Sequence, residues 1–486
     1  MAQETMPLQL KTNAQDRVAN LRVLHVVAIA SGANWMVDIL RGLKGRWYEV
    51  SALINNEEGD LASKLERNGI PYHVADFNLS DLFSNPLTFA NKLLNLTRFF
   101  RKHRFDIIHY HHIAASAVPG RIAAWVSDAP IRYSMIPHPF HLEVPTLSKI
   151  DRRTQWMDTK IIATCEYTRQ LYYKLGIQSS RIVRIYYGAD ETRFNPATAD
   201  ALKLRRELGI TPLEPVVGMI AYFYAPFPRE YWVPTYLKGR AVKGHETLIQ
   251  AAKKLREKKP NVKVLLVGNG WDKDGDEYRE HLKETVKNMG LSDTVIFTGY
   301  RGDTPDTLAS FDVSVQCARS ENLGGTIESL LMARPTIATA VGGMTESVIH
   351  QQTGLLVPPD DPDKLAEAIL ELLNNPERAR QLGQNGRQLM LREFTLDKTI
   401  DDIDNLYQSS AVKILRQSKP APLNLHYYRV YRTLMHFCLL IILLPCIADR
   451  WMILSVLKNL VRVIVNGAHL TLQKFRLGYL RRWSNG

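Results

Sequence analysis

The chain has 486 residues, 45% of them hydrophobic, with 28 Gly and 24 Pro; this excludes a disordered, fibrous or low-complexity protein. Four cysteines without short spacing exclude a disulfide scaffold and a cysteine-based zinc cluster, and they favour a reducing compartment. The net charge of +13 is concentrated in residues 411–486, which hold twelve Lys and Arg against one acidic residue. A nucleic-acid-binding domain, which spreads basic residues over a folded face, is therefore excluded, and no nucleic-acid partner is expected.

The N-terminal residues 1–20 are polar and are predicted to be disordered. They lack the charged-then-apolar pattern of a signal peptide, so the bulk of the chain is expected to be cytoplasmic.

From residue 21 onward, short apolar runs alternate with helical patterns. The first run, 21–30, is nearly continuous and rich in Val, which is typical of a strand buried on both faces of a parallel sheet. Further runs lie at 48–54, 105–110, 131–136, 160–164 and 181–186, with a helical pattern at 91–104. This alternation predicts β-α-β units, and hence an N-terminal Rossmann-like domain over residues 21–195.

A polar, turn-rich stretch at 188–208 interrupts the pattern before a second cycle begins. Its apolar runs lie at 215–221, 262–267, 294–298, 313–316, 335–339 and 354–357, and its helical patterns include 245–258 and 362–373. These runs predict a C-terminal Rossmann-like domain over residues 213–375. A ligand is expected where two such α/β halves meet.

The C-terminal residues 411–486 have a different character. The apolar run at 437–448 is interrupted by Pro445 and falls short of the ~20 residues of a spanning helix. The amphipathic stretch at 451–465, with Lys458 and Arg462, predicts an in-plane or shallow anchor attracted to anionic headgroups. A helical pair packed on the protein's own surface is the alternative.

The stretch 318–345 carries the strongest signs of chemistry. A glycine loop at Gly324 and Gly325 follows a short strand and opens a helix at Gly325 or Thr326, which suits a phosphate. Glu321 and Glu328 bracket the loop, and carboxylates there are good acceptors for sugar and ribose hydroxyls. The alternative for Glu328 is an ordinary first-turn acid that complements the helix dipole.

The sequence SENLGGTIESLLMARPTIATAVGGMTESV, followed by TGLLVPPDDPDKLAEAI, resembles the donor half of the retaining family 4 glycosyltransferases (glycosyl transferases group 1). The resemblance extends over residues 21–407 and includes FDIIHYHH, RIVRIYYGADETRF and KGHETLIQAAKKL. It implies an α/β GT-B fold, in which two Rossmann-like domains face a central cleft, an acceptor domain at 21–195 and a nucleotide-sugar domain at 213–375. Crossover helices are implied at 376–410. It also implies a hexosyltransferase that needs no metal and no cofactor, since the nucleotide-sugar is a co-substrate.

The resemblance assigns roles to the glutamates and glycines. Glu328 would bind the nucleotide ribose, Glu321 would reach the transferred sugar, and the Gly324 and Gly325 amides would hold sugar and pyrophosphate. The family usually has seven residues between its two glutamates, whereas six separate Glu321 from Glu328. Ser320 therefore competes with Glu321 for the first position.

The resemblance also assigns the cations that neutralise the pyrophosphate. Lys243 matches the family's lysine, with a solvated helix-start lysine as the alternative. The family's arginine follows the first strand of the second half, where Tyr222 stands here. Arg240, across an aromatic insertion at 222–240, is the predicted substitute, and a non-site arginine is equally open. The insertion itself is interpreted as a lid over the cleft, a contact with the lipid headgroup region or a packed surface loop.

Three further positions follow from the resemblance. Gly32 is the retained one of two glycines expected near the leaving phosphate. His138 falls near the family's acceptor-side histidine, with a packed loop histidine or a role for His141 as alternatives. Gly268 and Gly270 lie in a loop expected near the nucleotide base and phosphates.

Two other motifs are set aside. Residues 272–277 resemble a calcium loop, but Glu277 and Lys283 stand where Gly and Glu are required, so a solvated loop is predicted. His109, His111 and His112 suggest a metal cluster, but alternate strand residues point to opposite faces, and no carboxylate motif accompanies them. No metal site is predicted.

Together these features predict a retaining, metal-independent enzyme that transfers a sugar from a UDP-linked donor to a membrane-borne acceptor. The acceptor would be a glycolipid or a lipid-linked oligosaccharide in polysaccharide or glycolipid biosynthesis. The enzyme would be peripheral on the inner face of the membrane, held by its tail. The alternatives are a non-catalytic membrane-bound partner of a polysaccharide assembly machine and a GT-B sugar-nucleotide epimerase.

Overall fold

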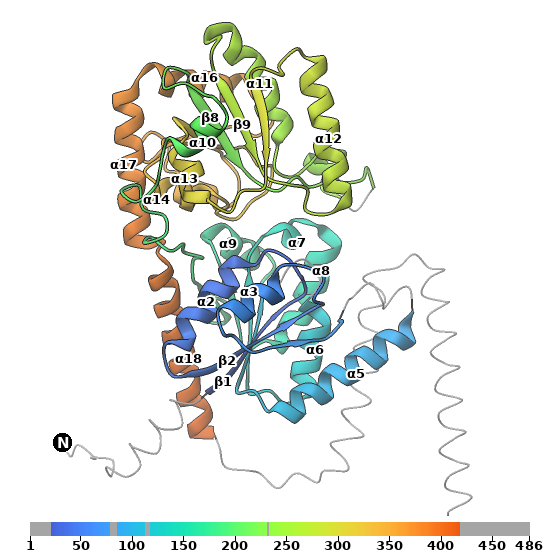
Figure 1. Cartoon of the computed structure of the whole chain (residues 1–486). Helices are drawn as coiled ribbons and strands as arrows, with labels where there is room; N and C mark the ends of the chain where they lie inside the picture. Colours follow the sequence, from blue (N-terminus) through green and yellow to red (C-terminus); the bar gives the residue numbers. More distant parts are fainter. Residues whose placement is uncertain (1–20, 78–84, 112–116, 231–232, 418–486) are drawn as a thin grey trace, which may run out of the picture. The chain divides into compact units, whose positions relative to one another are not determined.

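The computed structural model describes residues 21–77, 85–111, 117–230 and 233–417 (Figure 1). Apart from 85–91, these residues belong to one compact unit, which contains two β-sheets. We call the part built on the first sheet the first half, and the part built on the second sheet the second half. The predicted disordered residues 1–20 and most of the predicted membrane anchor, 418–486, lie outside the described residues.

The first sheet has seven parallel strands in the order β3-β2-β1-β4-β5-β6-β7. They are β1 (Leu21–Val27), β2 (Tyr48–Ile54), β3 (Tyr72–Val74), β4 (Ile107–His111), β5 (Ile131–Ile136), β6 (Lys160–Ala163) and β7 (Ile182–Arg184). Six of them lie at the predicted apolar runs. The edge strand β3 is not predicted, because its residues are partly exposed and do not form an apolar run.

Helices cover both faces of the first sheet. One face packs against α2 (Asn34–Lys44), α3 (Leu61–Arg67) and α18 (Leu396–Gln417), and the other against α5 (Pro86–His103) and α6 (Ala117–Val126). Val23 and Leu24 are neighbours on β1, yet they lie in the two opposite cores. Burial on both faces explains why β1 reads as a continuous apolar run. The remaining elements of this half are α7 (Phe140–Glu143), α8 (Pro145–Thr154), η1 (Gln155–Met157), α9 (Glu166–Lys174) and η2 (Ser179–Arg181).

The second sheet has six parallel strands in the order β10-β9-β8-β11-β12-β13. They are β8 (Val216–Ile220), β9 (Lys263–Val267), β10 (Val295–Gly299), β11 (Val313–Gln316), β12 (Thr336–Thr339) and β13 (Leu355–Val357). All six lie at the predicted runs. One face packs against α11 (His245–Lys258), α12 (Lys273–Asn288) and α16 (Pro362–Asn374), and the other against α10 (Lys203–Glu207), α13 (Thr304–Ala309) and α14 (Thr326–Leu331). The short elements η3 (Thr235–Leu237) and α15 (Met344–Ser347) complete this half.

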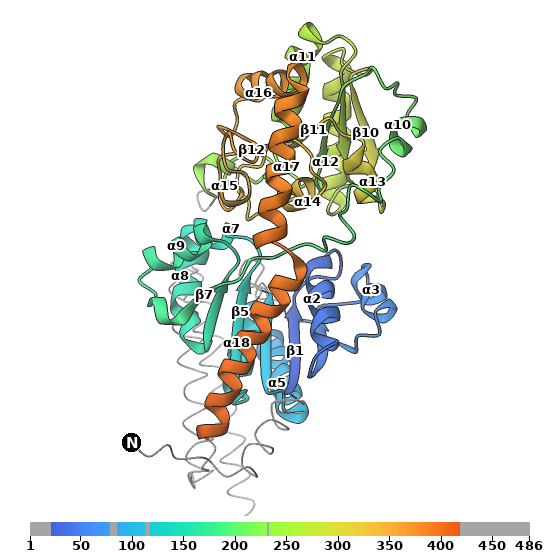
Figure 2. The ribbon, with the colours of Figure 1, turned by 90° about the vertical axis from the view of Figure 1, so that its left-hand side faces the viewer.

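Two long helices return the chain to the first half. α17 (Pro376–Glu393) packs on α14, and α18 packs on α2; in Figure 2 the two orange helices follow one another. Where the chain passes between the halves, Ala189 N–H donates to Phe394 O (3.1 Å) and Leu396 N–H to Ala189 O (2.9 Å). α18 continues to Gln417, so the predicted boundary at residue 410 falls inside this helix.

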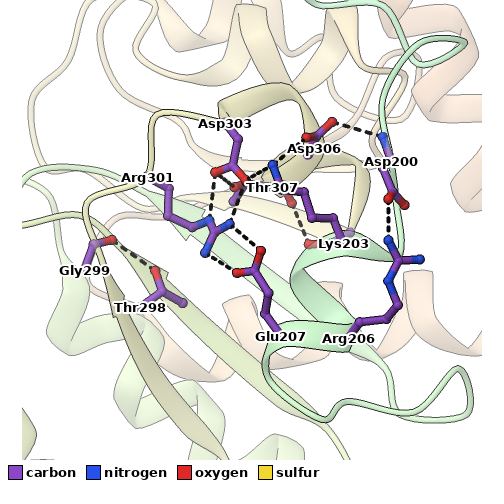
Figure 3. A network of polar contacts seen from close by, with 11 residues as sticks. Asp200, Lys203, Arg206, Glu207, Thr298, Gly299, Arg301, Asp303, Asp306 and Thr307 are labelled. Carbon is purple, nitrogen blue, oxygen red and sulfur yellow. Dashed lines mark hydrogen bonds and ion pairs between the residues drawn. The ribbon is translucent and has the colours of Figure 1, made fainter.

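The polar stretch between the two domains is docked on the second half. Leu204 and Ile210 belong to the core of the second sheet. Lys203 and Glu207 of α10 point toward the loop before α13 (Figure 3), where Arg301 pairs with Glu207 (2.7 Å) and Asp303 (2.6 Å). Lys203 pairs with Asp303 (2.7 Å) and Asp306 (3.1 Å). A charge network therefore fastens this segment at the protein surface.

A different kind of polar cluster lies inside the first half. The Arg121 guanidinium is fully buried and pairs with Asp151 and Asp158, at 2.9 Å to each. Because Arg121 lies on α6, Asp151 on α8 and Asp158 just before β6, the cluster ties three neighbouring elements together.

The histidines of β4 are also buried, and the sequence-based reasoning about them is wrong. His109 and His111 are two residues apart, so their rings lie on one face of β4, stacked with His25 of β1. His25 Nδ1 and His111 Nε2 are 2.8 Å apart, and His109 Nδ1 lies 2.6 Å from the Tyr407 hydroxyl on α18. These imidazole nitrogens face each other and a tyrosine, and the described residues hold no group of three or more His, Cys, Asp or Glu arranged around an ion. His112 lies outside the described residues.

Candidate functional site

The pair of Lys243 and Glu321 is the centre of the candidate site. Lys243 stands just before α11, and Glu321 follows β11 by a few residues. The Lys243 Nζ atom donates to the Glu321 carboxylate, and their side chains are only 20% and 9% exposed. Gly244 allows the segment that carries Lys243 to lie close to the segment that follows β11. At φ +71° its backbone passes so close to Cys317 that a Cβ on Gly244 would lie 2.1 Å from the Cys317 carbonyl oxygen.

Both members of the pair are charged. Burial acts to lower the pKa of Lys243, but the adjacent Glu321 carboxylate more than offsets it, so the pKa is raised. Burial acts to raise the pKa of Glu321, but the adjacent Lys243 ammonium more than offsets it, so the pKa is lowered. The site thus keeps a cation and a carboxylate side by side with little access to water.

His138 joins this pair from the first half. It lies in the loop after β5, and its Nδ1 accepts from Phe140 N–H (3.1 Å), so the proton of the neutral ring is on Nε2. Nε2 then donates to Ser320 O (3.3 Å) and lies 3.7 Å from Glu321 Oε1. Burial lowers the pKa of His138, so the ring is neutral. His141, the alternative from sequence, is buried and close to Arg121 and Asp151 instead.

Ser320 and Glu321, the two candidates for the first glutamate position, have different partners in the structure. Glu321 points to Lys243, whereas Ser320 Oγ donates to Glu143 Oε2 of the first half (2.6 Å). Gly324, at φ +55°, leaves room for Glu321, because a Cβ there would lie 2.9 Å from Glu321 Cγ.

The helix that follows the glycine loop is short. Gly325 precedes α14 directly, and α14 has six residues. Thr326 was expected to bind the donor, but its hydroxyl is buried and lies 2.7 Å from Ser347 Oγ. Only the backbone of Thr326 is left to serve a ligand.

Glu328, on the first turn of α14, lies near Asp38 of α2 and near Arg193 of the polar stretch between the two domains. Burial raises its pKa, while the nearby Arg193 acts to lower it and Asp38 acts to raise it. The carboxyl is thus close enough to both residues to interact with them electrostatically.

Aromatic rings connect Gly32 to Lys243. Gly32 follows β1 at φ +73°, and a Cβ there would lie 3.3 Å from the indole ring of Trp271. Trp271 stacks with Tyr224 at 5.6 Å and meets Tyr222 edge-on at 5.1 Å. Lys243 Nζ lies 5.8 Å from the Tyr224 ring centroid. Where the resemblance expects an arginine, this chain therefore has an aromatic wall.

Arg240, the predicted substitute for that arginine, is engaged elsewhere. It pairs with Asp360 at 2.6 Å, and its side chain is 50% exposed. Asp360 also accepts from Arg319 Nε at 2.6 Å. Within the described part of the chain Arg240 does not contact the Lys243–Glu321 pair. A role on the pyrophosphate stays a prediction, and it would require Arg240 to leave Asp360.

Two other predicted features belong to the second half. Gly268 and Gly270 pack on backbone, since a Cβ would lie 2.1 Å from Ala221 O or from Asp276 N respectively. The acidic run 272–277 is not a solvated loop but the start of α12: Asp272 caps the helix by accepting from Gly275 N–H (2.8 Å). Acidic side chains in a first helical turn complement the helix dipole.

Glu143 is the residue near the site that sequence reasoning misses. No motif marks it, and its partners, Tyr167, Tyr236 and Ser320, are scattered along the chain. The one available signal is the aromatic insertion that contains Tyr236.

Comparisons with known proteins agree with this architecture. Residues 32–188 match the family model described as "Glycosyl transferase 4-like domain", and residues 230–389 match "Glycosyl transferases group 1".

Among similar proteins is the N-acetyl-alpha-D-glucosaminyl L-malate synthase of Bacillus anthracis, 24% identical over 358 residues, which are 72% of this chain and 86% of the relative. Another is a GDP-mannose-dependent monoacylated alpha-(1-6)-phosphatidylinositol monomannoside mannosyltransferase of Corynebacterium glutamicum. It is 31% identical over 234 residues, which are 46% of this chain and 55% of the relative.

Solved structures show the same fold. HepE of Anabaena in complex with UDP and glucose aligns with a TM-score of 0.67 at 19% identity, covering 80% of this chain and all of that one. The sucrose-phosphate synthase of Thermosynechococcus elongatus aligns with a TM-score of 0.65 at 20% identity, covering 80% and 98%. With two parallel α/β sheets and family matches in both halves, this chain belongs to the group 1 glycosyltransferases and has the GT-B fold.

Proposed function

We propose that this glycosyltransferase transfers a sugar from a UDP-linked donor to a membrane-borne acceptor, such as a glycolipid or a lipid-linked oligosaccharide, with retention of configuration and without a metal ion. The observation that carries the proposal is the cluster of Lys243, Glu321 and His138. It combines a buried cation, a carboxylate and a neutral imidazole, drawn from both halves of the chain.

In this proposal Lys243 stabilises the charge that develops on the diphosphate as the anomeric C–O bond loosens. Such fixed electrostatic stabilisation is commonly the largest catalytic contribution. Glu321 accepts a hydroxyl of the transferred sugar, and Glu328 accepts the ribose hydroxyls of the nucleotide. The acceptor hydroxyl attacks the face from which the diphosphate leaves, so the configuration is retained and no side-chain nucleophile is needed.

The choice of UDP is supported by likeness. HepE, whose fold this chain shares, binds UDP and glucose. A relative from Corynebacterium glutamicum is GDP-mannose-dependent, so GDP is the leading competitor.

Thermal unfolding of the full chain with UDP, GDP, ADP, CMP and NAD tests the donor site. A nucleotide present at ~100 times its dissociation constant should add about 2.7 kcal/mol of stability. We expect UDP to raise the melting temperature and the other four to leave it unchanged. A rise in melting temperature with GDP alone would indicate a GDP-linked donor in place of a UDP-linked one. No change with any nucleotide would favour the non-catalytic alternative.

The membrane-borne acceptor is supported by the sequence of the C-terminal tail. Residues 418–486 combine apolar and basic stretches, which suits a helix lying on an anionic surface. Within the described residues, no helix is both long enough and apolar enough to cross a bilayer.

Membrane fractionation of the full chain and of a variant lacking residues 418–486 tests this proposal. We expect the full chain to pellet with membranes at low salt, and the truncated chain to lose activity on membrane extracts while it still binds UDP. Equal activity and equal partitioning of the two proteins would refute the proposal.

A further inference from the structure

The segment that contains His138 and α7 holds Ser320 at two atoms. Glu143 Oε2 accepts from Ser320 Oγ at 2.6 Å, and His138 Nε2 donates to Ser320 O at 3.3 Å. Ser320 is buried and immediately precedes Glu321. Because both its side chain and its carbonyl are fixed by the first half, the direction in which the chain enters Glu321 is fixed as well.

The aromatic insertion of the second half is fastened to the same segment. Tyr236 OH donates to Glu143 Oε2 at 2.6 Å, and Phe227 stacks on Phe140 with 4.9 Å between ring centroids and 22° between planes. Val233, Leu237 and Val242 are buried in one apolar cluster, against which Phe140 packs. The insertion is thus packed against α7 of the first half.

Glu143 is the point where these contacts converge. Its Oε1 accepts from Tyr167 OH at 2.9 Å, so the carboxylate accepts from three hydroxyl groups, two of them from the second half. A carboxylate only accepts hydrogen bonds, and hydrogen bonds to a charged acceptor are stronger than neutral ones. Burial and the neighbouring Glu143 raise the pKa values of Tyr167 and Tyr236, which keeps both hydroxyls protonated as donors.

We propose that Glu143 is a positioning residue of the glycosyltransferase: with Tyr167, Tyr236 and Ser320 it forms a clasp that seats the aromatic insertion on α7 and orients Glu321 toward Lys243. This inference rests on the proposed function for the part that concerns Glu321. The clasp also gives a physical explanation for the shortened spacing between Glu321 and Glu328. The residue before Glu321 is Ser320, whose hydroxyl donates to the Glu143 carboxylate of the first half.

Hydrogen exchange of the ligand-free full chain tests the clasp without any activity. Gly239 N–H donates to Phe227 O (2.8 Å) and Arg240 N–H to Leu237 O (3.0 Å), so peptides from 233–240 report on the insertion. We expect Tyr236→Phe and Glu143→Gln to speed exchange there about tenfold or more, the effect of losing one hydrogen bond to a charged group. The control is Tyr72→Phe. Tyr72 lies on β3, away from the insertion, and its OH also donates to two carboxylates, Glu57 and Glu66.

A double-mutant cycle sharpens this test. If Tyr236 acts through Glu143, Tyr236→Phe should change the exchange rate little in a chain that already carries Glu143→Gln. If the two residues act independently, the two changes in exchange free energy should be additive. Exchange in all variants equal to that of Tyr72→Phe would overturn the clasp, and additive effects would overturn the coupling through Glu143.

Turnover tests the positioning of Glu321. With the nucleotide-sugar that thermal unfolding selects, and with protein normalised to its UDP-binding concentration, Tyr236→Phe and Ser320→Ala should lower kcat about tenfold at an unchanged donor KM. Rates equal to those of Tyr72→Phe would overturn the positioning role even if exchange changes. If the wild-type chain binds no nucleotide, the proposed function fails, and the exchange experiment alone decides the clasp.

Discussion

The two halves of the molecule handle charged side chains in opposite ways. In the first half Arg121 is fully buried and pairs with Asp151 and Asp158, which are also buried. In the second half Arg301 makes the same kind of paired contacts, but Glu207 is 43% exposed and Asp303 22%. The chemistry of the two clusters is alike, and only their access to water differs.

This difference teaches which contacts the fold depends on. Water can replace the partners of Arg301, so such pairs contribute little. Nothing replaces the partners of Arg121, because an unpaired charge in the interior loses its solvation without compensation. The Lys243–Glu321 pair lies between these extremes, since it is mostly buried yet must meet a ligand.

The largest effect on stability should come from Arg121→Met. Removing the guanidinium leaves Asp151 and Asp158 buried without their partner, so the free energy of unfolding should fall by ~3–5 kcal/mol. Urea denaturation measures this loss. A fall no greater than that of the matched Arg301→Met variant would break the distinction between the two clusters.

The largest effect on activity should come from Lys243→Ala. Loss of a fixed charge that stabilises the departing diphosphate should lower kcat by ~10²–10³-fold. Steady-state turnover of the selected nucleotide-sugar measures this loss of kcat. The control is Lys254→Ala, because Lys254 is an exposed lysine on α11, the helix that follows Lys243. Equal rates for the two variants would remove Lys243 from the site.

Glu328→Ala should weaken donor binding by a hydrogen-bond-sized amount, ~1.5–3 kcal/mol. The affinity for UDP, measured by calorimetry, reports this loss, and Glu277→Ala on the exposed face of α12 is the control. An unchanged affinity would leave Glu328 as an ordinary first-turn acid.

Mild acid should affect the first half before the second. Burial lowers the pKa of His25 to about 3 and of His141 to about 4, and it lowers those of His109 and His111 well below the ordinary value. In the second half, burial lowers the pKa of His245 to about 3. The unfolded chain therefore binds more protons than the folded one below pH 6.5, and stability falls as the pH drops toward 3.

By this linkage His25 alone should cost about 2 kcal/mol between pH 6.5 and pH 5. Asp158, whose pKa burial raises to about 6, acts in the opposite sense below that pH and offsets part of the loss. Hydrogen exchange at pH 7 and pH 5, corrected for intrinsic rates, should show β1 and β4 losing protection before β8 and β11. Equal protection in both sheets at pH 5 would contradict this expectation.

The smallest effect should come from Arg301→Met. Each of its surface pairs contributes ~0.2–1 kcal/mol, and the contribution should fall further in high salt. Urea denaturation at low and high salt measures both. A loss as large as that of Arg121→Met would show that the network of Figure 3 is more than a surface fastening of α10.

Much of the fold could be read from local patterns. Apolar runs such as 21–30 and 313–316 predict the strands β1 and β11, because a strand buried on both faces needs apolar residues at successive positions. The helix over 245–258 is confirmed as α11. β3 and the helical start of α12 are missed, because β3 is a partly exposed edge strand without an apolar run and α12 begins in an acidic run that resembles a loop.

The candidate site could be predicted only in part from the sequence. Lys243 and Glu321 could be selected by resemblance, and the structure brings them together with His138. Arg240 could not be judged, because its partner Asp360 lies far along the chain. The histidines of β4 were misjudged for a different reason: His109 and His111 are two residues apart, so their side chains share one face of the strand.

The sequence by itself determined the two α/β halves, their family and the residue types available for sugar-nucleotide chemistry, because these depend on local periodicity and short motifs. Tertiary structure alone decided which polar groups meet. Glu143 shows this most clearly: no neighbouring residue marks it, and its role depends on three hydroxyls that the fold delivers from α9, the aromatic insertion and the loop after β11. A carboxylate's function is set by the donors around it, and only the folded chain brings those donors within hydrogen-bonding distance.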